Sequence, residues 1–267
     1  MGIWGYVGIF YLVSLICCAV GFKKYVYFLS VGYGFSIIGL GVAYFAISLA
    51  RVFDWNVLSC FQCCLFMIYG ARLSGFLIKR ELKNGNYRKV LKEATKEDEK
   101  PMPVFVKIAI WLCVGILYFA QTSPVFFRIY NGKGSDAVQL VGIIISAAGI
   151  ILEAISDQQK SAQKAENPNM VATKGLFKIV RCPNYLGEII FWTGVLVGSL
   201  NALHGVGQWL TAVIGWILIV FIMFNGAQRL DRRQEKRYGD MKEYRDYADH
   251  TPIIIPLIPV YHVGKYK

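Results

Sequence analysis

Charged residues are scarce in this chain, and so are the cysteine and histidine patterns that bind metals. Only 17% of the 267 residues are charged, whereas 55% are hydrophobic, and there are three histidines. The chain has seven cysteines, but Cys60-x-x-Cys63 has no second pair and no histidine nearby, which argues against a zinc site. We therefore expect no metal, and we interpret most of the cysteines as small buried hydrophobic residues.

The sequence also lacks a dinucleotide fingerprint, a glycosylation acceptor and a secretory signal. Gly39-x-Gly41 fails the fingerprint because Tyr44 stands at the third glycine position and no strand precedes it. No Asn-x-Ser/Thr sequence occurs. The first apolar run, residues 2–22, has no basic start and ends at a pair of lysines, so we expect a retained anchor.

Long apolar runs are what the chain does contain. A bilayer core about 30 Å thick needs about 20 apolar residues per helix, and the mean hydropathy of +0.44 indicates several such helices. Seven spans fit the sequence, at about residues 2–22, 26–50, 55–79, 104–122, 138–156, 184–203 and 208–226. The predicted fold class is an all-α polytopic membrane protein with about seven transmembrane helices.

The distribution of positive charge predicts the orientation of these helices. The net charge is +12, and 24 of the 29 lysines and arginines follow the first span directly or lie in loops 79–100 and 157–181 or in the tail from residue 227. Positively charged loops stay in the cytoplasm, so we predict the N-terminus outside and the C-terminus inside. Since topology accounts for the basic charge, we expect no nucleic-acid partner.

The stretch most informative about function is residues 175–188, GLFKIVRCPNYLGE, which runs from a basic loop into an apolar span. Pro183 suits the first position of a helix, because its missing N–H would have no partner there. Asn184 and Glu188 then share one helix face, just after Arg181. An acid at the mouth of a membrane helix is costly unless it faces protein or water. The pattern favours a ligand site at the membrane surface over a buried hydrogen bond to a neighbouring helix.

Other polar residues gather at the same predicted side. Four residues spaced 4, 3 and 4 apart line one face of a helix that leads into this loop: Glu153, Asp157, Lys160 and Lys164. A cationic helix is expected to follow the last span and to end near Gly239. Such a ring of polar groups would suit a cavity in which a water-soluble cofactor meets a membrane-dissolved substrate.

Residues 175–188, with Tyr244, Tyr247 and Ile255-Pro256 further on, resemble the C-terminal region of the steroid 5-alpha-reductase family, and most closely its branch of small membrane proteins. Sterol reductases are more distantly similar. The resemblance is specific over about residues 150–260, and it is present with fewer matches over residues 66–90. It implies a seven-helix bundle and an NADPH-dependent reduction of a carbon–carbon double bond conjugated to a ketone in a lipid.

The resemblance, with the polar side chains beside it, predicts the site. Residues 1–125 would line the substrate cavity and residues 126–267 would carry the cofactor-binding loops and tail. The predicted NADPH-binding residues are Asp157, Lys164, Arg181, Asn184, Tyr185, Glu188, Arg229, Arg232, Arg233 and Tyr244. Tyr69 and Tyr87 are predicted to donate a proton or hydrogen bond to the oxygen on which negative charge develops. The steroid reductases carry a glutamate near the substrate ketone in an early span, and no acid matches it here, which weakens the case for a steroid.

Two other function classes stay open. Isoprenylcysteine carboxyl methyltransferases resemble the same stretch, but they have a histidine where this chain has Cys182 and an acidic pair near Asp231-Arg232-Arg233. A cationic surface suits the 2′-phosphate of NADPH, whereas S-adenosylmethionine has no phosphate. A non-catalytic membrane scaffold is the third class, supported by the missing substrate-side acid. The membrane would be the endoplasmic reticulum in a eukaryote and the plasma membrane in a bacterium.

Overall fold

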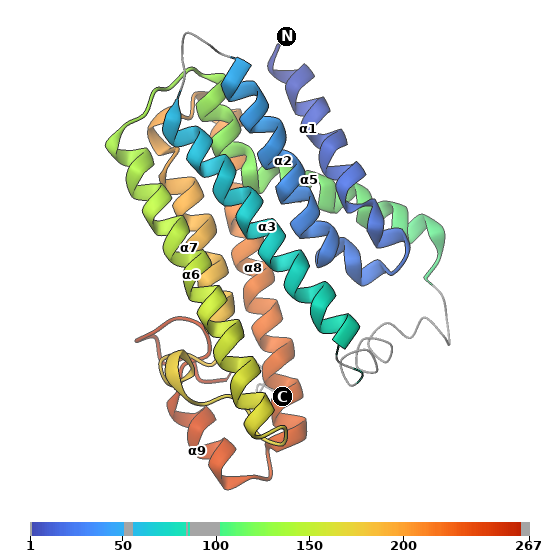
Figure 1. The fold of residues 1–267 in the computed structure, drawn as a ribbon, viewed down its shortest axis with the longest axis vertical. Coiled ribbons are helices and arrows are strands. Elements are labelled where there is room, and N and C mark those ends of the chain that lie inside the picture. The colour runs from blue at the N-terminus through green and yellow to red at the C-terminus, as the bar shows by residue number, and fades with distance from the viewer. Residues whose placement is uncertain (1, 51–55, 84, 86–101, 263–267) are drawn as a thin grey trace. The chain divides into compact units, whose positions relative to one another are not determined.

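The computed structural model describes residues 2–50, 56–83, 85 and 102–262, and in these residues it consists of helices without any β-strand (Figure 1). Six helical segments among them are long and apolar enough to cross a membrane. They are α1 (Ile3–Cys18) with η1 (Ala19–Phe22), α2 (Val31–Ala50), α3 (Val57–Lys83), α5 (Val104–Tyr130), α6 (Ala137–Glu166) and α8 (Gly205–Tyr238). The prediction of an all-α polytopic membrane protein is confirmed.

The sixth predicted span is shorter than expected. It corresponds to α7 (Pro183–Val197), whose 15 residues begin at the proline, as the sequence indicates. At about 1.5 Å per residue α7 is roughly 22 Å long, less than the hydrocarbon core of about 30 Å. The count of seven spans and their orientation therefore stay predictions. The other short elements are η2 (Tyr25–Leu29), η3 (Gly175–Lys178), η4 (Leu200–Ala202) and α9 (Lys242–His250).

The chain forms two compact units. Unit 1 comprises residues 1–143 and 195–215, and unit 2 comprises residues 144–194 and 216–267. Three helices, α6, α7 and α8, contribute to both units. The predicted division at residue 125, into a substrate-side and a cofactor-side half, stays a prediction.

Unit 1 is held together by close helix contacts and by aromatic rings. A Cβ added to Gly70 on α3 would lie 2.3 Å from the carbonyl oxygen of Gly34 on α2, so the two backbones are in direct contact. Phe10 of α1 meets Tyr44 of α2 and Phe126 of α5 edge to face, with ring centroids 4.7 Å and 5.0 Å apart. These rings join three helices at one point, as aromatic pairs commonly do in cores.

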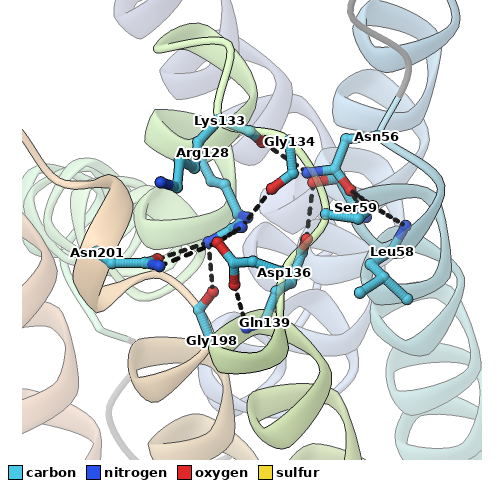
Figure 2. Close-up of polar contacts among 11 residues, drawn as sticks. Asn56, Leu58, Ser59, Arg128, Lys133, Gly134, Asp136, Gln139, Gly198 and Asn201 are labelled. Atoms are coloured by element: carbon cyan, nitrogen blue, oxygen red, sulfur yellow. Dashed lines mark hydrogen bonds and ion pairs between the residues drawn. The ribbon is translucent and has the colours of Figure 1, made fainter.

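A buried ion pair closes the end of α5 (Figure 2). Arg128 is fully buried, and its Nη2 lies 2.5 Å from Asp136 Oδ2, while its Nη1 donates to Asn201 Oδ1 at 2.9 Å. The other carboxylate oxygen of Asp136 accepts the backbone N–H of Gln139 at 2.9 Å in the first turn of α6. Burial alone would raise the pKa of Asp136, but the hydrogen bonds from Arg128, Gln139 and Asn201 lower it to about 2. Arg128 thereby connects the loops on either side of it.

Unit 2 is built around an equally close contact between α6 and α7. A Cβ added to Gly149 would lie 2.6 Å from the carbonyl oxygen of Gly187, and one added to Gly187 would lie 2.6 Å from Glu153 Cγ. On the other side of α7, a Cβ added to Gly226 of α8 would lie 3.2 Å from the Tyr185 ring. Figure 1 shows α6, α7 and α8 side by side in this unit. The N-terminal end of α7, which we call its mouth, therefore lies between two longer helices, α6 and α8.

Candidate functional site

The loop that leads into α7 is fixed by glutamines from α6. Gln159 Oε1 accepts the N–H of Leu176 at 2.9 Å, and Gln163 Oε1 accepts the N–H of Lys174 at 2.8 Å. Gly175 has φ of +68°, in the left-handed region that favours glycine, and a Cβ there would lie 2.4 Å from Gln159 Oε1. Gly175 is therefore required for this loop to lie against α6.

The C-terminal tail pairs with the backbone just before α7. The N–H groups of Arg181 and Cys182 donate to the carbonyl oxygens of Pro252 and Ile253, both at 2.8 Å. The Tyr247 hydroxyl of α9 donates to the carbonyl oxygen of Phe177 at 2.7 Å. Two segments about 70 residues apart in sequence are therefore joined by hydrogen bonds just before α7.

Arg181 forms a buried ion pair beside these hydrogen bonds. Its Nη2 lies 2.9 Å from Asp231 Oδ1, and the two side chains are 1% and 3% exposed. The same Nη2 donates to the backbone carbonyl of Tyr261. A guanidinium buried to this degree is stable only when charge and hydrogen bonds compensate it. Asp231 supplies the charge and the tail supplies a further acceptor.

Some buried polar atoms beside this pair have bonding capacity left over. Among the described residues, Arg181 Nε and Nη1 and Asn184 Oδ1 have no hydrogen-bond partner. Tyr244 is fully buried near Arg181, and burial raises the pKa of its hydroxyl to about 12 against the opposing effect of that charge. Its hydroxyl therefore stays protonated at neutral pH. Buried polar groups are nearly always paired, so unpaired donors and an unpaired acceptor at one helix mouth are typical of a ligand site.

The two glutamates of the site lie along the α6–α7 contact. Glu188 is 5% exposed, and its Oε1 accepts the indole N–H of Trp192 at 3.0 Å. Glu153 is 3% exposed and its Cγ lies against Gly187, directly before Glu188 in sequence. Tyr185, on the same turn, contacts the buried cluster around Cys182 and Ala227. Two buried carboxyl groups therefore flank one close helix contact.

Cys182 is part of this packing and not a reactive thiol. It is 2% exposed, and burial raises its pKa to about 12. A thiolate would be needed for nucleophilic chemistry, and burial opposes its formation.

The predicted residues Asp157 and Lys164 lie further out along α6. Asp157 is half-buried, one turn beyond Glu153. Lys164 Nζ donates to the Tyr238 hydroxyl at 3.0 Å and to the carbonyl oxygens of Pro168 and Met170. Lys164 therefore links the loop after α6 to α8 by hydrogen bonds.

The predicted tail arginines lie on another surface. Arg229, Arg232 and Arg233 are exposed on α8, whereas Asp231 between them is buried against Arg181. Their assignment to the cofactor stays a prediction.

The predicted proton donors belong to unit 1 or fall outside the described residues. Tyr69 is fully buried in α3, and its hydroxyl donates to the Tyr33 hydroxyl at 3.1 Å. The Tyr33 ring in turn lies 5.0 Å from that of Tyr118, centroid to centroid. Tyr87 lies outside the described residues.

Sequence reasoning missed the residues that complete the Arg181 environment. Asp231 was overlooked because its neighbours in sequence are arginines. Its helix face can nevertheless be read from the spacing, since Ala227, Asp231, Gln234 and Tyr238 are 4, 3 and 4 residues apart and all are buried except the half-buried Gln234. That spacing predicts a buried helix face and could have singled it out. His262 Nε2 lies 2.7 Å from Asp249 Oδ1 and its Nδ1 3.9 Å from Asp231 Oδ1, a contact that no local pattern indicates.

The match to a known family covers most of the chain. The profile of the DUF1295 family, described as a protein of unknown function, matches residues 26–251, which include the loop and both buried ion pairs. The chain belongs to this family. An uncharacterized protein of Schizosaccharomyces pombe is 42% identical over 133 residues, which cover 48% of this chain and 46% of that protein.

Two further relatives are named as steroid reductase and steroid dehydrogenase enzymes. Steroid 5-alpha-reductase DET2 of Gossypium hirsutum is 25% identical over 45% of this chain and 42% of its own length. The 3-oxo-5-alpha-steroid 4-dehydrogenase 1 of Bos taurus is 24% identical over 60% of this chain and 58% of its own. The chain thus spans about half the length of the curated relatives it matches. The resemblance to the steroid 5-alpha-reductase family is confirmed. No solved structure matches the chain significantly.

Proposed function

We propose that this protein is a membrane-embedded, NADPH-dependent reductase of a conjugated carbon–carbon double bond in a lipid. The observation that carries the proposal is the set of unpaired buried atoms at the mouth of α7, namely Arg181 Nε and Nη1 and Asn184 Oδ1. The names of two relatives, a steroid 5-alpha-reductase and a 3-oxo-5-alpha-steroid 4-dehydrogenase, support an oxidoreductase that acts on a lipid.

These groups fit the cofactor chemically. Arginine N–H groups bind phosphate oxygens with strong, charge-assisted hydrogen bonds, so Arg181 would hold a phosphate of NADPH. The Asn184 Oδ1 acceptor would take an N–H of an amide or adenine group. Asp231 holds the guanidinium in place from the other side, at 2.9 Å. The indole of Trp192 fixes the orientation of Glu188 at 3.0 Å, so this carboxyl is positioned before any ligand arrives.

Bound NADPH would supply a hydride to the beta carbon of the enone. The chain's own task is to position the cofactor, exclude water and stabilise the negative charge that develops on the ketone oxygen. We propose Tyr69 as a donor to that oxygen. Its hydroxyl is fully buried, and it would exchange its present hydrogen bond to the Tyr33 hydroxyl for one to the ketone oxygen. A proton must reach the alpha carbon for the product to be the saturated ketone.

The test is turnover by the detergent-purified protein with deuterated NADPH and a panel of lipid enones. We expect deuterium at the beta carbon of the product, with equimolar NADP⁺ formed. Asn184→Ala should reduce the rate at least tenfold, because the open acceptor is lost, whereas Asn169→Ala in the exposed loop should leave it unchanged. Methyl transfer from S-adenosylmethionine without any NADPH oxidation would contradict the proposal.

A further inference from the structure

The end of α8 carries five exposed cations on one face. They are Arg229, Arg232, Arg233, Lys236 and Arg237. Their spacing of 3, 1, 3 and 1 keeps all five within an arc of roughly 140°, at about 100° per residue. We refer to these five residues as the basic face.

The opposite face of the same turns is buried in unit 2. It carries Ala227, Asp231 and Tyr238, which are 0%, 3% and 6% exposed. Asp231 makes the ion pair with Arg181 from this buried side. The basic face is centred roughly 180° around the helix from these residues, so it is turned away from the buried Arg181 pair.

The basic face also lies at a defined depth relative to the membrane helices. Cys182, just before α7, packs in one cluster with Ala227 of α8, so these two residues are level. Arg229 and Arg233 are then about 3 Å and 9 Å further along α8, at about 1.5 Å per residue. A headgroup layer is roughly 5–8 Å thick on each side of the hydrocarbon core. If the core ends where apolar α7 begins, the Cα atoms of Arg229 and Arg232 lie at headgroup depth and that of Arg233 lies just beyond it, within reach of its long side chain.

A second observation concerns apolar side chains outside the helices, which are exposed near the start of α7. Leu257 is 98% exposed with φ of +66°, an uncommon conformation for a leucine, and Ile258 is 46% exposed. The tail is bound to Cys182 through Ile253, so Leu257 lies within about 14 Å of that point at no more than about 3.6 Å per residue. Ile179, just before α7, is 54% exposed. Large apolar side chains exposed at this depth are typical of a segment that meets lipid.

We propose that the basic face binds the headgroup phosphates of anionic phospholipids. Positive charge faces negative charge, the arginines offer bidentate donors, and the helix that carries them continues directly from an apolar span that exposes Ile217, Leu218 and Phe221. A cation near an anionic membrane surface strengthens binding about fivefold. This inference assigns Arg229, Arg232 and Arg233 to lipid and leaves Arg181 and Asn184 to the cofactor, and it does not depend on the reductase proposal.

The experiment uses the full chain purified in an uncharged detergent. Phosphatidylglycerol, phosphatidylcholine and inorganic phosphate are titrated separately, and binding is followed by native mass spectrometry and by the thermal unfolding midpoint. The triple variant Arg229→Gln, Arg232→Gln, Arg233→Gln is compared with a matched control that removes three exposed charges elsewhere in unit 2: Lys174→Gln, Lys242→Gln, Arg245→Gln. Each variant is also titrated with NADPH.

We expect phosphatidylglycerol to bind the wild type, with weak binding of the other two ligands and with affinity that falls as salt is raised. The triple variant should bind phosphatidylglycerol about 100-fold more weakly, whereas the control should stay within about fivefold of wild type. Equal loss in both variants would show a general charge effect and overturn the assignment. Loss of NADPH binding in the triple variant, with phosphatidylglycerol binding kept, would return these arginines to the cofactor site. Absence of NADPH binding in every protein would contradict the reductase proposal alone.

Discussion

Two buried arginines, Arg128 and Arg181, each pair with one aspartate, but they differ in what surrounds them. Both Nη atoms of Arg128 are engaged with oxygens of the neighbouring loops. In Arg181 only Nη2 has a partner among the described residues. Arg128 Nε is also without a partner in the described part of the chain, but both Nη atoms of Arg128 are bound, so this arginine is a structural link. Arg181 differs in that its Nη1 is unpaired as well as its Nε.

The structural role of Arg128 gives a prediction about stability. Asp136→Asn removes its charge partner and should lower the free energy of unfolding by about 2 kcal/mol, less than the 3–5 of a fully buried pair because Asp136 is 26% exposed. Denaturant unfolding in detergent measures this. Asp240→Asn, at a fully exposed pair 3.9 Å apart, is the matched control and should change little.

The pH dependence of this pair has a defined sign. The folded-state pKa of Asp136 is about 2, below the unfolded value of about 3.9. A lowered pKa means that the stabilisation is complete above about pH 4 and is lost as the pH falls from about 4 to 2. The difference in midpoint between wild type and Asp136→Asn should therefore be constant from pH 7 to 4 and shrink below. A difference that grows as the pH falls would contradict the assignment.

Sequence reasoning at this scale singled out residues within one short motif, but not the distant residues that contact them. Arg181, Asn184 and Glu188 stand in one short motif, so helical spacing alone indicates a shared face. Asp231 and the tail that contacts Arg181 are 50 or more residues away, and only the fold brings them there. Lys164 was predicted to bind cofactor from its place on a polar face, which does not reveal the backbone carbonyls that it contacts.

At the scale of elements, glycine contacts decide how helices approach one another. A Cβ on Gly149 would lie 2.5 Å from the backbone N of Phe191, which is backbone of α7 and has no flexible end that could move aside. Gly75 in α3 has nothing within 4 Å of the same position. Gly75 is therefore a suitable control for Gly149, since both lie in predicted membrane helices but only Gly149 is in close contact with another helix.

Gly149→Ala should destabilise the protein by about 1–3 kcal/mol through overpacking. Gly75→Ala should be neutral or stabilise by up to about 1 kcal/mol, because alanine is the better helix former. Unfolding midpoints of the two variants measured side by side check this. Equal midpoints for both variants would mean that α6 and α7 do not meet at Gly149.

The elements themselves were largely predictable because apolar runs set helix length. The expected cationic helix after the last span is the end of α8, which stops at Tyr238, next to the predicted Gly239. The predicted sixth span, residues 184–203, extends past the end of α7 at Val197 and includes the short helix η4. The sequence stays apolar through this turn, so the hydropathy pattern does not show where the helix ends.

At the scale of the whole molecule, the number of crossings decides where the termini lie. Seven crossings place them on opposite sides of the membrane, as the positive-inside rule predicts, whereas six place them on the same side. α7 is the helix whose crossing is in question, because of its length.

Reporter fusions at each terminus measure this directly. We expect a fluorescent protein at the C-terminus to be cytoplasmic and one at the N-terminus to be outside, with α7 completing its crossing through the turn that follows it. Both reporters in the cytoplasm would show six crossings and would mean that α7 does not cross. The positive-inside rule, applied to seven crossings, would then have predicted the wrong side for the N-terminus.

The central claim is that the mouth of α7 binds NADPH, and the thermal unfolding midpoint tests it most directly. Wild type and Asn184→Ala are measured with NADPH, NADH and S-adenosylmethionine. Because Asn184 Oδ1 has no partner among the described residues, the substitution should leave the ligand-free midpoint unchanged. NADPH at 100 times its dissociation constant should stabilise the wild type by about 2.7 kcal/mol, and Asn184→Ala should lose most of that shift. A shift with S-adenosylmethionine alone, or an equal NADPH shift in both proteins, would contradict the account.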